Sequence, residues 1–255
     1  MMPARDPSML RFACRKLLYW GLRYRCPLCR SSLRTFVPFG VRAPVLGSLQ
    51  VVGGGYRRHA RCPICDCLDR ERLVYLILRR VTDVFEKPTR LLHVAPERQL
   101  SGVLKSHPTV DYLTADLHST HVMVKMDICT IHFPDEHFDG IVCNHVLEHI
   151  VDDRRAMAEL YRVLRPNGWA ILQVPLSLAL DHTYEDFSIT TPAGREAAFG
   201  QHDHVRIYAR DYKDRLESVG FKVNVVRWTT RVHDFGGPGN RFGLNAREEV
   251  YLAAK

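Results

Sequence analysis

Apolar runs typical of buried strands alternate with helical segments over the second two thirds of the chain. The runs are RLLHVA (90–95), VDYLTAD (110–116), FDGIVCN (138–144), WAILQVP (169–175), FKVNVVRW (221–228) and EEVYLAAK (248–255). Strands that alternate with helices in this way pair in parallel and are covered by helices on both faces. The pattern therefore predicts an α/β domain built on a largely parallel sheet.

Two segments have helical spacing of their apolar residues. The clearer one begins at Asp152 and Asp153 and ends at the RPNG segment, residues 165–168, and its buried face comprises Met157, Leu160, Tyr161 and Leu164. Acids in its first turn and arginines in its last turn suit the helix dipole. The other helix covers residues 68–85, with Leu73, Leu76, Ile77 and Val81 on one face, and we expect it to join an N-terminal head to the body.

The composition is that of a folded protein, with 46% hydrophobic and 25% charged residues. The sequence contains no run of about 18 apolar residues, so it predicts no membrane span. The first residues also lack the pattern of a signal peptide, and we therefore expect a cytoplasmic protein. The N-terminal segment carries an apolar stripe that comprises Leu10, Leu17, Leu18 and Trp20. We expect this stripe to pack on its own domain, and binding to an anionic membrane surface is the alternative. A formal charge of +8 permits an anionic partner such as RNA without requiring one.

Six of the eight cysteines precede residue 70, and four of them form the pairs CPLC and CPIC. Each Cys-x-x-Cys turn offers two thiolates, so two such turns complete a four-thiolate zinc site; its predicted ligands are Cys26, Cys29, Cys62 and Cys65. With no ligand position left for water, the zinc would be structural. Cys67 and His59 remain alternative ligands, and redox or merely buried cysteines remain the alternative to a metal. We expect this head, with its joining helix, to occupy residues 1–85 and the α/β domain to occupy 86–255.

Residues 133–175 read FPDEHFDGIVCNHVLEHIVDDRRAMAELYRVLRPNGWAILQVP. This stretch resembles the central block of class I methyltransferases that use S-adenosylmethionine, in particular of the methyltransferases called type 11. The order of strands extends this resemblance over about 90–255. The resemblance implies a Rossmann-like, doubly wound sheet of seven strands whose last strand, EEVYLAAK, is antiparallel. It also implies S-adenosylmethionine as the cofactor.

The cofactor turn departs from the pattern of this family. Where the family has an acidic residue followed by three alternating glycines, this sequence has His93, Ala95, Glu97 and Gln99. The cofactor carries no pyrophosphate, so the phosphate-binding reason for glycine does not apply. Ala95 is the next smallest residue and Pro96 suits the first turn of a helix. Glu97 is expected either to bind the ammonium group of the cofactor or to favour the helix N-terminus. The stretch resembles a subgroup in which HVAPE replaces the glycine turn.

Downstream residues match the cofactor site more closely. Asp116 ends the second strand, where a carboxylate binds ribose hydroxyls in nucleotide-binding folds, or else caps the strand end. The resemblance implies that Leu117 packs on the adenine and that Asp127 and Ile128 meet its amino group. By the same resemblance Asn144 and His145, at the end of FDGIVCN (the fourth strand of the family), lie beneath the methionine part of the cofactor, whereas Glu148 and His149 are structural.

The polar segment 176–208 is too long for a simple connection and is expected to form a cap over the acceptor. His204 is our candidate for the base or positioning group, because HVRIYARDYKDRLESVGF resembles the histidine segment that precedes the last helix of the family. His145 is the second catalytic candidate. Arg206 is expected to orient an anionic substrate and Tyr184 to line the acceptor pocket.

The sequence thus predicts a methyltransferase that acts on a small-molecule or glycan-type acceptor. An RNA methyltransferase that uses the zinc head to bind RNA is one alternative, favoured by the basic charge. A non-catalytic adapter that has lost its cofactor with its glycines is the other. The identity of the acceptor, the atom methylated and the oligomeric state are left open by the sequence.

Overall fold

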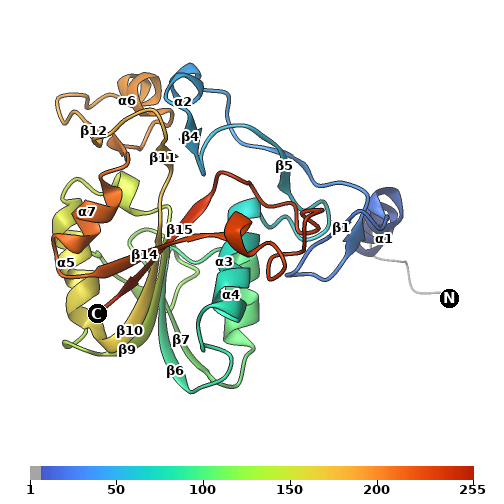
Figure 1. The fold of residues 1–255 in the computed structure, drawn as a ribbon, viewed down its shortest axis with the longest axis horizontal. Helices are drawn as coiled ribbons and strands as arrows, with labels where there is room; N and C mark the ends of the chain where they lie inside the picture. The colour runs from blue at the N-terminus through green and yellow to red at the C-terminus, as the bar shows by residue number, and fades with distance from the viewer. Residues whose placement is uncertain (1–6) are drawn as a thin grey trace.

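The computed structural model describes residues 7–255 and is centred on a seven-stranded sheet (Figure 1). The strands are β6 (Thr89–Val94), β7 (Val110–Asp116), β8 (Val124–Lys125), β9 (Phe138–Asn144), β10 (Leu164–Gln173), β14 (Lys222–Arg227) and β15 (Glu249–Ala254). They lie in the order β14-β15-β10-β9-β6-β7-β8, and only β15 runs antiparallel to its neighbours. This arrangement confirms the predicted doubly wound, Rossmann-like fold and its antiparallel last strand.

Helices cover both faces of the sheet (Figure 1). One face carries α3 (Asp69–Arg80) and α4 (Arg98–Lys105), and the other carries α5 (Asp153–Val163) and α7 (Tyr212–Glu217). Ile77 of α3 packs with Val142 of β9 in one core, and Leu160 of α5 packs with Ile141 of the same strand in the other. Burial on both faces explains why the strands form nearly continuous apolar runs rather than alternating ones.

The local signals in the sequence mark most boundaries of these elements. All six predicted strands are present, and the side chain of Asp152 caps α5 by accepting a hydrogen bond from the Arg155 N–H. Strand β8 was missed because it is two residues long, too short for a periodic signal.

The head is built from short paired strands around the cysteines. Strands β1 (Tyr24–Arg25) and β2 (Ser32–Leu33) form one antiparallel pair, and β3 (Val37–Phe39) and β5 (Arg57–Arg61) form another. Helix α3 follows the head along the chain, and its fully buried Arg72 side chain donates to the carbonyls of Ala60 in the head and of Gly243.

A segment of the head reaches over the far end of the body. It contains α2 (Pro44–Ser48) and β4 (Val51–Val52), and β4 pairs with β11 (Leu176–Ser177) at the start of the predicted cap. The rest of the cap comprises β12 (Tyr184–Glu185), α6 (Pro192–Phe199) and β13 (Arg206–Ile207). In Figure 1 these elements lie together at one end of the molecule, with α2 beside α6.

We expected the apolar stripe of the first helix, α1 (Pro7–Tyr19), to be buried, but its described side chains are exposed. Leu17 is 80% exposed, and Leu18 and Trp20 are also exposed; the side chain of Leu10 lies outside the described ones. Within residues 7–255, no helix has the length and apolar character needed to cross a membrane.

Candidate cofactor site and zinc site

A cavity of about 490 Å³ opens at the carboxyl ends of the parallel strands. This is the edge where open α/β sheets bind their ligands, and the size is that of a typical small-molecule site. The cavity is lined by Val94, Ala95, Asp116, Leu117, His118, Met126, Asp127, Ile128, His145, Val146, His149, Ile150 and Asp203. Six of these residues are among those that the sequence predicted for the site, so the strand ends do bring them together.

One carboxylate oxygen of Asp116 accepts hydrogen bonds from the protein, and the other accepts none from the described residues. Its Oδ1 accepts hydrogen bonds from the backbone N–H groups of His118 and Ser119, both at 2.7 Å. These bonds fix the carboxylate at the rim of the cavity, and no described residue donates to Oδ2. Asp116 is therefore held in place and retains an acceptor for a ligand hydroxyl.

The turn after β6 takes a glycine-like conformation without a glycine. Ala95 has φ +47°, in the left-handed region that favours glycine, and its N–H donates to the Ala115 carbonyl. The small side chain of Ala95 lines the cavity. Alanine thus adopts the backbone conformation typical of glycine here, at a conformational cost of about 1 kcal/mol.

A buried polar network supports this turn from behind. His93 is fully buried, with its Nδ1 2.8 Å from the Tyr112 hydroxyl and its Nε2 2.8 Å from Glu97 Oε2. Asn144 donates to the other oxygen of Glu97 at 3.1 Å. Burial alone would raise the pKa of Glu97, but His93 holds this pKa below its ordinary value. Of the predicted cofactor residues, Pro96 and these three (His93, Glu97 and Asn144) lie outside the cavity lining.

Two buried atoms at the end of β9 have no hydrogen-bond partner among the described residues, Oδ1 of Asn144 and Nε2 of His145. The other ring nitrogen of His145, Nδ1, lies 3.3 Å from Glu148 Oε1. Burial lowers the pKa of His145 well below its ordinary value, so the ring is neutral and one nitrogen can accept. An ammonium group supplies the donors that these atoms lack, so the residues fit the methionine end of S-adenosylmethionine.

His204, the favoured catalytic candidate, is buried and does not line the cavity. Its ring meets that of His149 edge to face, with ring centroids 4.7 Å apart, and burial lowers its pKa to about 4. His149 lines the cavity itself, whereas the resemblance had implied only a structural role for it. Burial also raises the pKa of Glu148, beside it, to about 8.

The two predicted substrate residues also lie away from the cavity lining. Arg206 is buried, and its guanidinium donates to Glu185 and to the carbonyls of Leu147, Ile150 and Val151. These bonds fasten the cap to the loop after β9. Tyr184 is 40% exposed and packs against Phe199 of the cap.

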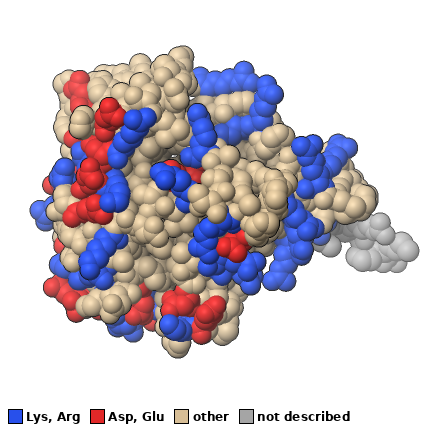
Figure 2. All heavy atoms as spheres, viewed as in Figure 1, with Lys and Arg blue, Asp and Glu red and all other residues tan. Residues whose placement is uncertain are grey.

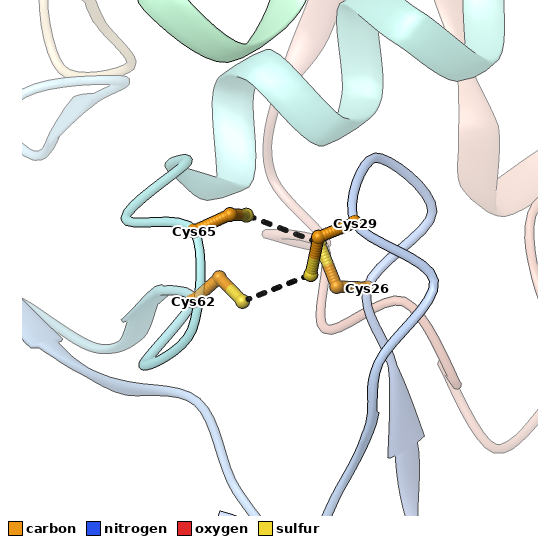
Figure 3. Close-up of side chains that lie close together, drawn as sticks. All are labelled: Cys26, Cys29, Cys62 and Cys65. Carbon is orange, nitrogen blue, oxygen red and sulfur yellow. Dashed lines mark hydrogen bonds between the residues drawn. The ribbon is translucent and has the colours of Figure 1, made fainter. Parts of the chain in front are cut away.

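The four predicted zinc ligands converge in the head (Figure 3). Their sulfurs all lie within 4.8 Å of one another, and the pairs Cys26–Cys65 and Cys29–Cys62 are both 3.8 Å apart. With Zn–S bonds of about 2.3 Å, the sulfurs of a tetrahedral site lie about 3.8 Å apart, so the cluster fits zinc. Cys67 Sγ lies 3.4 Å from Cys26 Sγ but is not part of the four-sulfur group.

The sheet order, the antiparallel last strand and the cavity at the carboxyl edge define the fold of class I, S-adenosylmethionine-dependent methyltransferases. Residues 87–172 match the family model described as a methyltransferase domain. No curated protein matches the sequence.

Solved structures share this fold at low sequence identity. The 4+2 cyclase SpnF is 17% identical with a TM-score of 0.51, and the match covers 85% of this chain and 99% of SpnF. The 1,6-didemethyltoxoflavin-N1-methyltransferase of Burkholderia thailandensis is 16% identical with a TM-score of 0.48 and covers 71% of this chain and 75% of its own. At such identities the likeness shows the fold alone, and one fold hosts different reactions.

Proposed function

We propose that this protein transfers a methyl group from S-adenosylmethionine to a small-molecule or glycan-type acceptor, with a structural zinc in the head. The observation that carries the proposal is the cavity at the carboxyl edge, with Asp116 held at its rim by two backbone N–H groups. A free carboxylate oxygen in this position suits the ribose of a nucleoside ligand. When bound, S-adenosylmethionine supplies an activated methyl group on its sulfonium.

The remaining lining suits the other parts of the cofactor. Leu117, which is 48% exposed, and the buried Ile128 both line the cavity and offer apolar surface for the adenine. Asp127 also lines the cavity and is proposed to accept from the adenine amino group. Asn144 and His145 offer unpartnered acceptors to the ammonium, while Glu97 holds the turn through His93.

At the reacting end, the chain contributes mainly alignment. Methyl transfer is an in-line displacement, and holding the two reactants in position provides a large part of the rate enhancement. His145 lines the cavity and is proposed to contact the reactants there. His204 packs behind His149 and is proposed to position it.

Isothermal titration calorimetry with S-adenosylmethionine tests the proposal. We expect the wild type to bind and Asp116→Ala to bind about 10- to 150-fold more weakly, because a hydrogen bond to a charged group contributes roughly 1.5 to 3 kcal/mol. Asp111→Ala is the matched control, since Asp111 lies on the same strand and its carboxylate pairs with Arg90 at the surface. No binding to the wild type, or equal affinity in Asp116→Ala, would refute the proposed cofactor site.

An RNA acceptor is the second candidate, favoured by the charge of the head. Residues 1–65 contain 12 of the 36 Lys and Arg residues but only 1 of the 28 Asp and Glu residues. Figure 2 shows many basic side chains on the part of the visible face that belongs to the head. Incubation of the pure protein with methyl-labelled cofactor and separated RNA and small-molecule fractions of a cell extract distinguishes the two, since label should enter only one fraction.

A further inference from the structure

A second cluster of metal-type ligands lies beside the cofactor cavity. Glu148 and His149 belong to a short 3-10 helix, η1 (Leu147–His149), just after β9, and His204 lies two residues before β13 of the cap. One ligand atom from each of the three residues lies within 4.8 Å of the other two. His149 lines the cofactor cavity, so the cluster borders the space where an acceptor would meet the cofactor.

The carboxylate of this cluster lacks the partners that its burial demands. Glu148 is 2% exposed, and its Oε2 has no hydrogen-bond partner among the described residues. The other oxygen has His145 Nδ1 at 3.3 Å. A buried carboxyl oxygen is costly without a partner, so an unpartnered oxygen in a residue that clusters with two imidazoles points to a missing cation.

The imidazoles have the arrangement that metal-binding histidines adopt. His149 Nδ1 lies 3.2 Å from Asp203 Oδ2, and a hydrogen bond donated there leaves Nε2 with its lone pair available. A carboxylate behind a ligating histidine fixes the tautomer and the orientation of the ring. His204 is buried against His149, which brings a second imidazole to the same point without exposing it to solvent.

We propose that Glu148, His149 and His204 bind one divalent transition-metal cation beside the cofactor cavity, and that this cation binds a hydroxyl oxygen of the acceptor. Two imidazoles and a carboxylate suit zinc, manganese, iron or cobalt, and three protein ligands leave positions open for the acceptor. The metal site stands on the geometry of the cluster, whereas its role toward the acceptor rests on the proposed methyl transfer.

Such a cation narrows the acceptor to molecules that carry a hydroxyl group. Coordination lowers the pKa of the hydroxyl, so its proton passes to water at neutral pH. The oxygen then forms a bond to the methyl carbon while the carbon–sulfur bond breaks, and its electron pair stays on the sulfur of S-adenosylhomocysteine.

Manganese binding followed by electron paramagnetic resonance tests the site on the intact protein prepared with one zinc per chain, the amount that the four-cysteine site holds. Mn²⁺ prefers oxygen and imidazole ligands to thiolates, so the four-cysteine site does not compete for it. We expect one Mn²⁺ per chain in the wild type and at least about 10-fold weaker binding in Glu148→Gln and in His204→Ala, because each loses one of three ligands. His202→Ala is the matched control, since His202 lies two positions away, is 71% exposed and is not in the cluster.

Thermal melting of the same samples separates loss of a ligand from loss of the fold. We expect Mn²⁺ to raise the melting temperature of the wild type and of His202→Ala but not of Glu148→Gln, whose side chain has nearly the same shape as that of glutamate. If the wild type binds no Mn²⁺, or if a folded Glu148→Gln binds it as tightly as the wild type, the metal site is refuted. Calorimetry with S-adenosylmethionine on the same preparation keeps the outcomes distinct: binding of the cofactor without Mn²⁺ overturns only this inference.

Discussion

Replacing Arg72 by methionine should cost about 3 to 5 kcal/mol of the free energy of unfolding. The guanidinium of Arg72 is fully buried, lies 3.7 Å from the centroid of the Phe36 ring and donates five hydrogen bonds to backbone carbonyls. These carbonyls belong to His59, Ala60 and Cys67 of the head and to Phe242 and Gly243 of the C-terminal loop. One side chain therefore joins two segments that are far apart in the sequence.

The magnitude follows from the acceptors that Arg72→Met leaves behind. Three of the five bonds are 2.8 Å long, to Phe242, Ala60 and Gly243. Each buried carbonyl that loses its donor costs about 1 to 1.5 kcal/mol, so the three short bonds give about 3 to 4.5 kcal/mol and the two longer ones provide the rest of the stated total. Methionine fills a similar volume, so the loss reports hydrogen bonds rather than a cavity. Since a domain is stable by only about 5 to 15 kcal/mol, the variant should be markedly less stable.

Urea unfolding at 25 °C, followed by fluorescence, measures the change. Arg80→Met is the matched control, because Arg80 lies on the same helix, is exposed and should change stability by no more than about 0.5 kcal/mol. Arg72→Lys keeps the charge but not the planar fork, so it should restore little of the loss. A cost below about 1 kcal/mol for Arg72→Met would refute the view that this arginine holds the head to the body.

Three further predictions concern the zinc, a buried acid and the cofactor turn. Cys65→Ser should lower bound zinc well below one equivalent, measured by mass spectrometry, and destabilise the head, whereas Cys14→Ser, at an exposed cysteine outside the cluster, should do neither. Burial raises the pKa of Glu248 to about 7, so its protonated form favours folding at low pH and stability falls as the pH rises from about 4.5 through 7. Glu248→Gln should avoid this loss of stability, which amounts to up to about 3 kcal/mol. The melting temperature of the variant should therefore be higher than that of the wild type at pH 8 but not at pH 4. Ala95→Gly should leave the affinity for S-adenosylmethionine within about threefold of the wild type and change stability by less than about 1 kcal/mol, since relief at φ +47° is offset by entropy in the unfolded chain.

The sequence predicts the long elements of the body because each carries enough residues for a periodic signal. FDGIVCN coincides with β9, and the helix that begins after Asp152 is present. Helix α2 and the two-residue strands of the cap were not predicted, because segments this short carry no periodic signal and depend on tertiary contacts; β11, for example, pairs with β4 more than a hundred positions away, Ser177 opposite Val51. Short segments of this kind are determined by tertiary contacts rather than by local pattern.

In the candidate site, too, some residues could be placed from the sequence and others could not. Asp116 ends β7 and Asp127 lies two residues after β8, so the fold itself brings both to the carboxyl edge, where they line the cavity. The positions of long side chains are harder to predict, because a guanidinium can end several ångströms from its backbone. Arg206 was expected to meet a substrate, but its guanidinium is buried among the carbonyls of the loop after β9. Only the packing of the cap against that loop reveals this.

The cofactor turn shows how a site can keep its shape without its usual residues. Glycine in such a turn provides positive φ and room for a ligand, and Ala95 retains both at a modest conformational cost. The cost must be met by contacts that hold the turn, because strain persists only where the surrounding structure determines it. His93, Glu97 and Asn144 form such contacts, since the Glu97 carboxylate links the end of β6 to the end of β9. The histidine and the glutamate of HVAPE therefore act as a support for its alanine, and the loss of the glycines is not evidence that the cavity has lost its ligand.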